Sequence, residues 1–427
     1  MTDLIESRIK VIKEGKLPEG YKRTKAGIMP VDWDGTIQAK KLFKKHTDKK
    51  HDGDLEILAA TQERGIVPRS QIGIDIQCSD EGVKGYKKVS KGDFVISLRS
   101  FQGGIEYSEY TGIISPAYTV LKPIKDISTG FYRNYFKTDT FIKRLNGAVY
   151  GIRDGKQIGY RDFGDMYVHC PPLAEQERIA EILIQCDRVI ELKEKKLDEL
   201  KQLKKEFLRK MFPAKGCDTP EIRFPGFTGA WEQRKLGTVT ELLTGFPFES
   251  KKFTNDGIKL VRGTNVKRGY LDFSEGLCEY WTSAQGLENY LLKSGDILIQ
   301  MDGALIGKSY AKIRENQLPA LLVQRVTRAR VQSNNADEAF VYQQIQKGFL
   351  AYIKGTKTET AVPHLSLSDI ENFMIEIPSI GEQKQIGAFF EQLDTLITLH
   401  QRELEETKTY KKTLAKLLLT GIVRVQG

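Results

Sequence analysis

The stretch EQERIAEILIQCDRVIELKEKKLDELKQLKKEFLRKMF (175–212) returns in diverged form as EQKQIGAFFEQLDTLITLHQRELEETKTYKKTLAKLLL (382–419). The offset is a constant 207 positions, and twelve of the 38 aligned residues are identical. The identical pairs include Glu175 and Glu382, Gln176 and Gln383, Asp187 and Asp394, and Lys204 and Lys411. Similarity at one fixed offset indicates a duplicated structural unit.

Both copies have the pattern of a long amphipathic helix. Prolines precede each copy, in YVHCPPLAEQ and in MIEIPSIGEQ, and prolines before a periodic run mark a helix start. Apolar residues then recur at alternating steps of four and three, which is a heptad seam, although Lys193, Lys204 and Lys411 interrupt it. About 40 residues at roughly 1.5 Å each predict a rod of about 60 Å.

Each apolar seam needs a partner, and the other copy is the simplest one. The second helix follows a whole intervening domain, so we expect the two to pack antiparallel as a coiled coil. In the alternative, each helix only covers its own domain. The residues expected to pack between the helices are Ile179, Leu183, Ile190, Leu197, Ile386, Phe390, Ile397 and Leu404.

The segments before the two helices look like divergent versions of one α/β domain. KVSKGDFVIS (88–97) matches LLKSGDILIQ (291–300), and each predicts a Gly-Asp turn followed by a buried strand. Each segment also has a Trp near its start, in VDWDGTIQAKKLF (31–43) and GAWEQRKLG (229–237). The predicted fold class is therefore α/β (α+β), with two duplicated domains that are each followed by a long helix.

The predicted organisation has four parts. The first domain, with a short N-terminal helix, spans 1–170 and is followed by a spacer helix at 171–216. The second domain spans 217–377 and is followed by a C-terminal spacer helix at 378–427.

Composition narrows the possible functions. A formal charge of +10 favours a polyanionic partner such as nucleic acid over a membrane surface, which would need a basic helix with bulky apolar anchors. No secretory signal or long apolar span is visible, so we expect a cytoplasmic protein. The five cysteines form no CxxC pair and have no histidine at ligand spacing, so neither a disulfide framework nor a zinc site is expected.

Six loops mix Arg, Lys, Gln and Asn with glycine, which is the chemistry that reaches base edges and phosphates. They are 61–71, 97–104 and 150–157 in the first domain, and 261–270, 301–309 and 354–364 in the second. The alternative for each loop is ordinary solvated surface. The candidate DNA-binding residues are Gln62, Arg64, Arg69, Arg99, Gln102, Arg153, Lys156, Arg262, Asn265, Lys267, Arg268, Lys308, Lys354 and Lys357.

No pattern in the sequence predicts a catalytic or metal site. GALIGKS (303–309) resembles a phosphate-binding loop, but only three residues separate its two glycines where four are needed. The Pro-Pro pair at 171–172 does not form a methyltransferase motif, and Glu-x-Lys triplets such as 191–193 have the alternating charge of a solvated helix face.

Two copies of a Pro-x-x-x-Glu-Gln-x-x-Ile helix start, at 171–179 and 378–386, each close a Gly-Asp-strand domain. This pattern resembles the specificity subunits of Type I restriction-modification systems over nearly the whole chain. The resemblance implies two target-recognition domains that each read one half of an interrupted DNA site, and two helices that set the spacing.

The resemblance also implies partners. The spacer helices would contact methyltransferase (modification) subunits, and restriction/translocase subunits would join the complex. S-adenosylmethionine, ATP and Mg²⁺ would bind to those partners, so no cofactor is expected on this chain.

Two other functions stay open on sequence alone. The chain could be a stand-alone DNA nuclease or methyltransferase with an unrecognised active site, and it would then act on DNA without partners. It could also be a coiled-coil scaffold with no DNA role, and it would then bind no duplex even in a partner complex.

Overall fold

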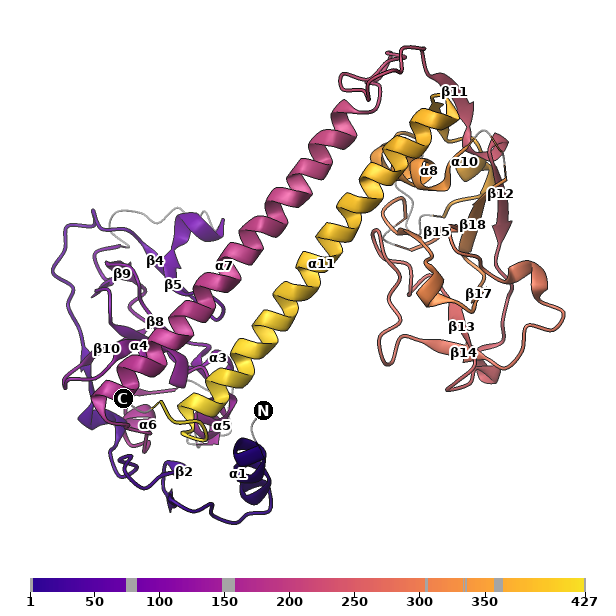
Figure 1. The fold of residues 1–427 in the computed structure, drawn as a ribbon. Helices are drawn as coiled ribbons and strands as arrows, with labels where there is room; N and C mark the ends of the chain where they lie inside the picture. The colour runs from indigo at the N-terminus through magenta and orange to yellow at the C-terminus, as the bar shows by residue number, and fades with distance from the viewer. Residues whose placement is uncertain are drawn as a thin grey trace. The chain divides into compact units, whose positions relative to one another are not determined.

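The computed structural model describes residues 3–73, 83–147, 158–303, 306–332, 334, 336–356 and 364–425. The chain divides into two compact units (Figure 1). Unit 1 comprises Met1–Lys193 and Glu403–Gly427, and unit 2 comprises Glu194–Arg402. The division passes through both repeated segments, so each unit contains half of each.

The two repeated segments are long helices, as the heptad pattern predicts. They are α7, Leu173–Lys210, and α11, Ile380–Leu419. Of the residues expected to pack between them, six are buried and two, Ile190 and Ile397, are half-buried.

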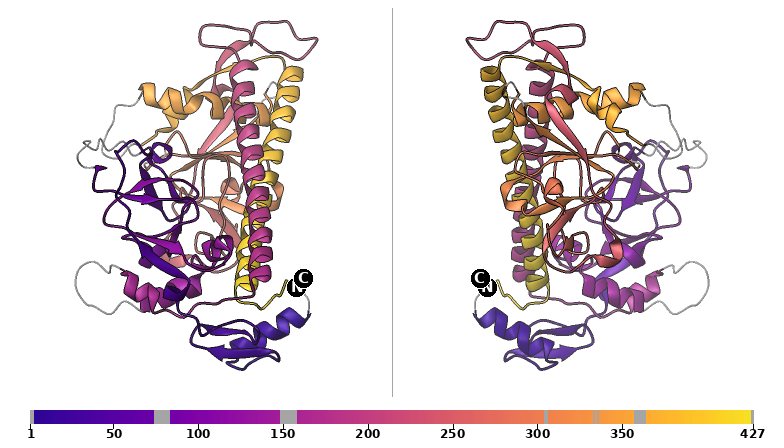
Figure 2. Two further views of the ribbon diagram at one scale, coloured as in Figure 1. Left: turned by 90° about the vertical axis from the view of Figure 1, so that its left-hand side faces the viewer. Right: turned by 90° about the vertical axis from the view of Figure 1, so that its right-hand side faces the viewer.

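Ion pairs within each unit show that α7 and α11 run antiparallel (Figure 2). In unit 1, Lys411 near the end of α11 bonds to Asp187 of α7. In unit 2, Lys204 near the end of α7 bonds to Asp394 of α11 at 2.6 Å. Under the 207-residue offset, one pair is the copy of the other, so the contacts follow the duplication and confirm the antiparallel coiled coil.

Each unit contains a four-stranded antiparallel sheet with the same strand order. In unit 1 the order is β3-β10-β7-β8, and in unit 2 it is β12-β18-β15-β16. The first set is Phe43–His46, Thr119–Pro123, Phe94–Ile96 and Glu106–Tyr107. The second set is Thr240–Thr244, Val326–Val331, Ile297–Gln300 and Tyr310–Lys312. The two domains are therefore copies of one architecture.

The matching Gly-Asp turns explain why these sheets were recognisable in the sequence. Gly92 and Gly295 adopt φ values of 96° and 90°, which side-chain-bearing residues rarely adopt. The carboxylates of Asp93 and Asp296 then accept hydrogen bonds from the backbone N–H groups of Ser90 and Lys293. Each turn delivers the chain into the buried strand β7 or β15.

Apart from α7 and α11, the strands, α-helices and π-helical turn that lie outside these sheets each belong to one unit. In unit 1 they are α1 (Asp3–Lys13), β1 (Tyr21–Thr24), β2 (Gly27–Pro30), β4 (Leu58–Thr61), β5 (Gly65–Pro68), β6 (Lys87–Val89), α3 (Ser100–Gly103), β9 (Gly112–Ile114), α4 (Thr129–Tyr135), α5 (Asp139–Gly147) and α6 (Tyr160–Gly164). In unit 2 they are β11 (Glu232–Lys235), β13 (Ile258–Val261), β14 (Glu279–Trp281), β17 (Ala320–Leu322), α8 (Glu338–Gln344), the π-helical turn Ile345–Phe349, α9 (Leu350–Thr356), α10 (Leu367–Glu371) and β19 (Met374–Ile377).

The long helices contribute to the core of each unit. In unit 1, Ile179 and Leu183 of α7 and Leu418 of α11 pack against an aromatic cluster around Trp33 and Phe131. In unit 2, Ile386 and Phe390 of α11 and Phe212, just after α7, pack around Trp231 and Phe340. Each helix therefore both covers a domain and packs on the other helix, so the alternative in which each helix only covers its own domain is wrong.

The repeated Gln of each helix start ties that helix to its domain through backbone atoms. The Gln176 amide donates to the Pro171 carbonyl at 2.8 Å and accepts from the N–H of Ser128, the N-cap residue of α4, at 3.0 Å. Gln383 does the same with Pro378 and with Asp337, the N-cap residue of α8, at 2.9 and 3.0 Å. The repeated Gln therefore has a structural role at this position.

Candidate nucleic-acid interface

Two of the predicted loops of unit 1 lie side by side. The turn at 62–64 joins β4 to β5, and α3 lies in the loop at 97–104. The side-chain amides of Gln62 and Gln102 are 3.4 Å apart, and both residues are exposed. A Cβ on Gly103 would lie 2.7 Å from the Gln62 side chain, so this glycine permits the close approach.

A partly buried ion pair between Lys137 and Glu106 holds these two loops together. The Lys137 ammonium donates to the backbone carbonyls of Gln62 and Gly103, at 3.2 and 3.0 Å, and to the Glu106 carboxylate at 2.6 Å. Glu106 is only 2% exposed. Burial raises the pKa of Glu106 to about 7, although Lys137 opposes this shift. Hydrogen bonds from Lys137 thus fix the position of the two loops relative to each other.

The predicted DNA-binding arginines of unit 1 differ in their exposure and in their contacts. Arg64 is exposed and donates to the side chain of Gln71 at 2.7 Å. Arg69 is half-buried, donates to the Tyr86 hydroxyl at 3.2 Å and lies over the Tyr86 ring. Arg99 is exposed at the start of α3. The predicted residues Arg153 and Lys156 lie outside the described residues.

In unit 2, the structure corrects the prediction for Asn265. Its side chain is 0% exposed. The amide donates to the carbonyls of Asp272 and Leu277, and its oxygen accepts from the N–H of Arg262. An amide enclosed by its own loop has no donor left for a base edge.

Arg262 is held by the same loop. Its guanidinium donates to the Leu277 carbonyl at 2.8 Å, lies 3.7 Å from the Glu279 carboxylate and stands over the Phe253 ring. Arg262 is therefore half-buried and braces the loop. Lys267 is also half-buried, whereas Arg268 at the loop's end is exposed.

The three predicted loops of unit 2 meet in part around Gln300, at the end of β15. The positions of a Cβ on Gly263 and on Gly303 lie 3.2 and 3.5 Å from the Gln300 amide nitrogen. Asp302 forms an isolated β-bridge with His364, which brings the third loop to the same place.

The lysines of unit 2 lie on the surface around these loops. Lys308 and Lys354 are exposed. They are on neighbouring segments, because a Cβ on Gly307 would contact Leu350 and Ile353 of α9 at 3.3 and 3.5 Å. The predicted residue Lys357 lies outside the described residues.

One exposed arginine beside this site was missed in the sequence. Arg325, on the turn between β17 and β18, has φ of 71°, and its side chain is 70% exposed. Its guanidinium lies 3.2 Å from the Asp302 carboxylate, and its carbonyl accepts from the N–H of Met301. The turn VQRV (323–326) contains no Gly, Pro, Asn or Asp, so the sequence gives no signal for it.

Two observations concern metal sites and membrane-spanning helices. Across the described parts of the chain, no group of three or more His, Cys, Asp or Glu side chains is placed to hold a metal ion. Nor does any helix there have both the length and the apolar character of a membrane span. Of the segment 303–309, which resembles a phosphate-binding loop in sequence, the structure describes Gly303 and 306–309.

One protein family matches this chain twice. The Type I restriction modification DNA specificity domain matches residues 35–202 and 229–409, which together cover more than half of the chain. Each match includes one domain and most of the long helix that follows it.

Relatives and solved structures agree with this match. The chain is 29% identical over 356 residues to the Type I restriction enzyme MjaVIII specificity subunit of Methanocaldococcus jannaschii, covering 79% of this chain and 81% of that protein. It is 22% identical over 431 residues to the EcoKI specificity subunit of Escherichia coli K12, covering 96% and 90%.

Two solved structures share the fold. The Type-I restriction-modification system S subunit from M. genitalium aligns at a TM-score of 0.59 with 14% identity, over 94% of this chain and 97% of that chain. A chain solved in work on complex assembly and conformational transition of the type I R-M system aligns at 0.52 with 15% identity, over 96% and 100%. At these identities, the likeness concerns the fold alone.

Proposed function

Because this chain belongs to the Type I restriction modification DNA specificity family, we propose that it recognises an interrupted DNA site, with one half-site read by each unit. The observation that carries this proposal is the duplication. The two units have the same strand order and the same Gly-Asp turn, yet their surface loops differ in sequence. A shared framework with unlike loops suits two readers of different half-sites.

The reading surface is proposed to consist of the loop clusters. In unit 1, Gln62 and Gln102 present adjacent amides, and a glutamine amide can form two hydrogen bonds with adenine in the major groove. Exposed Arg64 and Arg99 stand on the same two loops. In unit 2, the corresponding surface carries Arg268, Lys308, Arg325 and Lys354.

The long helices are proposed to set the distance between the half-sites. α7 contains 38 residues, which corresponds to about 57 Å at 1.5 Å per residue. One turn of B-DNA is about 34 Å, so a helix of this length is comparable to between one and two turns. Its ends belong to different units, which is the arrangement that a spacer requires.

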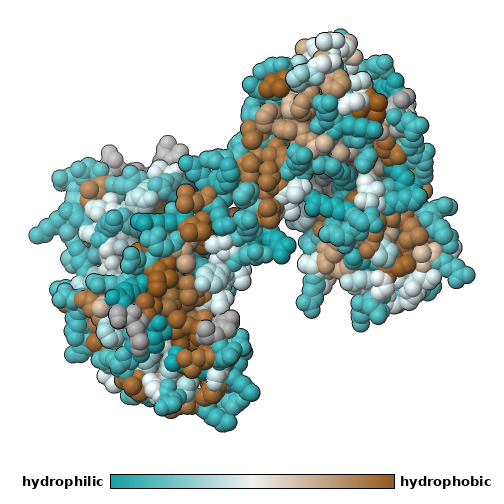
Figure 3. Space-filling view, in the orientation of Figure 1, coloured by the Kyte–Doolittle hydropathy of each residue, from teal (hydrophilic) through white to brown (hydrophobic). Residues whose placement is uncertain are grey.

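The helix pair is also the proposed docking surface for modification subunits. Figure 3 shows hydrophobic side chains gathered over the helices of unit 1. Some of these side chains line a groove of about 560 Å³ between α7 and α11. Its lining includes Ile182, Val189, Tyr410 and Leu414. Val189 and Tyr410 are exposed in the chain as it stands, and an exposed apolar patch on a helix pair suits a helical partner. Restriction subunits are proposed to join the same complex.

Catalysis is proposed to belong to those partners. We expect S-adenosylmethionine, ATP and Mg²⁺ to bind to the modification and restriction subunits, and none of them to bind to this chain. The competing function is a nuclease or methyltransferase that acts alone.

The test is to map methylated adenines in cells that express this chain with its modification subunits. The expected result is one motif of two short defined sequences separated by an unspecified spacer, which is absent from cells that lack this chain. The purified chain should neither cut nor methylate the same DNA when S-adenosylmethionine, ATP and Mg²⁺ are supplied. Activity of the chain alone would favour the enzyme, and absence of duplex binding even in the complex would favour a scaffold.

A further inference from the structure

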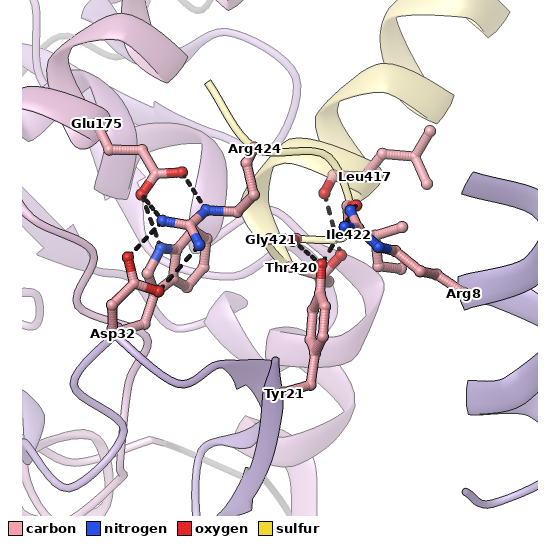
Figure 4. A network of polar contacts seen from close by, with 10 residues as sticks. Arg8, Tyr21, Asp32, Glu175, Leu417, Thr420, Gly421, Ile422 and Arg424 are labelled. Atoms are coloured by element: carbon pink, nitrogen blue, oxygen red, sulfur yellow. Dashed lines mark hydrogen bonds and ion pairs between the residues drawn. The ribbon is translucent and has the colours of Figure 1, made fainter. Parts of the chain in front are cut away.

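The segment after α11 forms hydrogen bonds and ion pairs with residues near the N-terminus and with the start of α7 (Figure 4). The Arg424 guanidinium donates two hydrogen bonds to Glu175, at the start of α7, at 2.7 and 2.9 Å. It donates two more to Asp32, at 2.9 and 2.6 Å. The Trp33 indole N–H also donates to Glu175 at 2.8 Å, and Arg424 stands over the Trp33 ring. One arginine therefore joins the end of one helix to the start of the other.

Backbone contacts fix the rest of this segment. The Leu419 carbonyl contacts the His169 ring at 3.1 Å, and the Gly421 carbonyl accepts from the Tyr21 hydroxyl at 2.7 Å. The Ile422 carbonyl accepts from Arg8 at 2.9 Å. The first contact satisfies a carbonyl group that the end of α11 leaves without a helical partner, and the other two hold the backbone just beyond the helix.

The same device occurs in unit 2. Arg223, in the segment after α7, donates to both oxygens of Glu382 at 2.7 Å each. Glu382 lies in the first turn of α11 and is the copy of Glu175 in the duplication. In each unit, therefore, the segment after one long helix clasps the start of the other. We call these the Arg424 clasp and the Arg223 clasp.

Both clasps neutralise carboxylates that are out of water. Glu175 is 7% exposed and Glu382 is 0% exposed, and a buried carboxylate without a partner is strongly destabilising. The planar guanidinium fork also fixes direction, because two parallel hydrogen bonds to one carboxylate allow little rotation. A lysine could supply the charge but not this geometry.

Ion pairs along the seam set the register between α7 and α11, and the clasps add a constraint at the helix ends. Polar or charged residues interrupt it at Lys193, Lys204, His400, Thr407 and Lys411. Polar and charged steps of this kind specify the register of a helix pair, here through the Lys204–Asp394 and Lys411–Asp187 pairs. The clasps act at the ends of the helices, where a small shift would break a two-pronged hydrogen bond.

We propose that Arg424 and Arg223 are positioning residues that fix the ends of α7 and α11 against one another and thereby the spacer length that the protein accepts. This inference rests on the proposed function, since it concerns the same interrupted site. It adds the residues that determine spacer selectivity, which lie away from the reading loops.

The experiment uses the chain in complex with its modification subunits. The probes are duplexes that carry the mapped methylation site with its natural spacer or with a spacer one or two base pairs shorter or longer. The variants are R424Q and R424K, and the control is R234Q, which removes a half-buried arginine paired with Glu232 in β11. The measured quantity is the ratio of affinity for the natural spacer to affinity for each altered spacer.

We expect R424Q to reduce this ratio by about tenfold or more, which corresponds to roughly 1.4 kcal/mol, while binding to the natural spacer falls less. R424K should reduce the ratio by a smaller factor, because it keeps the charge and loses the fork. R234Q should leave it unchanged.

An equal loss of affinity at every spacer length would show a merely structural role and overturn the proposal. If R424Q does not fold, as judged by its circular dichroism and thermal melt, the variant R424Q/E175Q removes the unpaired carboxylate and is tested in the same way. Failure of the wild-type complex to bind even the duplex with the natural spacer would instead contradict the proposed function.

Discussion

His169 shows how much one side chain can contribute at the junction of distant segments. Its two ring nitrogens face the carbonyls of Leu419 and Ala26, each at 3.1 Å, and its side chain is buried. Burial lowers the pKa of His169 from the ordinary value of 6.5 to about 4, although both carbonyls favour the charged ring. The ring is therefore neutral at pH 7 and donates to only one of the two carbonyls.

This pKa predicts a pH-dependent stability of unit 1. In the unfolded chain His169 binds a proton near pH 6.5, and in the folded chain only near 4. Its contribution to the free energy of unfolding is therefore complete above pH 6.5. That contribution is lost as the pH falls towards 4, to a total of roughly 3 kcal/mol. The measurement is urea unfolding of the wild type and His169→Gln at pH 7.5 and pH 5.

The comparison between variants isolates this residue from Glu106. The raised pKa of Glu106 acts in the opposite sense, because its contribution is lost as the pH rises through about 7. We expect the wild type to lose more stability between the two pH values than His169→Gln. Equal losses in both proteins would contradict the assignment of this pH dependence to His169.

Individual site residues were the least predictable part of the molecule. Asn265 has the right chemistry in the right kind of loop, but its amide is consumed by the carbonyls of Asp272 and Leu277. Arg325 is exposed beside the same cluster, but no turn residue marks its position. Sequence reports which side chains a loop has, whereas the folded path decides which of them face solvent.

The long helices were the most predictable elements, because 38 aligned positions repeat at one offset and share one heptad seam. The sequence did not reveal the role of their charged residues. Lys204 and Lys411 look like interruptions of the seam, yet they pair with Asp394 and Asp187 on the facing helix. Those pairings depend on the register between two helices, which neither helix specifies alone.

At this scale we predict that the Lys204–Asp394 pair is strongly coupled. Lys204 also donates to Gln346 at 2.7 Å, and the two partners expose only 12% and 26% of their side chains. Lys204→Met should destabilise unit 2 by about 3 kcal/mol, because it leaves the poorly solvated Asp394 carboxylate without a charged partner. The double variant Lys204→Met/Asp394→Leu should recover most of this loss.

The measurement is a double-mutant cycle by chemical denaturation, with Lys201→Met as the control on the exposed face of α7. We expect Lys201→Met to change the free energy of unfolding by less than about 0.5 kcal/mol. Strictly additive effects of the two substitutions at Lys204 and Asp394 would show that the residues do not interact.

The whole chain combines two units of equal architecture and unlike surfaces. The duplication and the Gly-Asp turns were enough to predict two copies of one domain, and the shared strand order confirms them. The pairing of the chain's beginning with the segment after α11 was not predictable. It depends on contacts between residues more than 390 positions apart, such as Asp32 and Arg424, and no repeated pattern marks them.

At the scale of the whole molecule, we predict that both units bind phosphates of one duplex. Each phosphate contact that a substitution removes should reduce the magnitude of the slope of log affinity against log salt concentration by about 0.9. Replacing Arg64 and Arg99 by Gln should lower the slope by about 2, and so should replacing Lys308 and Lys354. The combined variant should lose about 4 if both pairs contact the same DNA.

The measurement is a salt titration of the partner complex on a duplex with the mapped site. Lys201→Gln, on the exposed face of α7, serves as the control and should leave the slope as in the wild type. A combined variant with no greater loss than either pair alone would show that only one unit contacts the backbone at a time.

The bonds made by Gln176 and Gln383 have a consequence for how such proteins change over generations. Each amide connects its helix to the N–H of one residue and the carbonyl of another. Backbone groups are the same whatever side chain is attached to them. A lineage can therefore acquire an unrelated reading surface and inherit the old scaffold unaltered, provided that the new domain's main chain follows the former path.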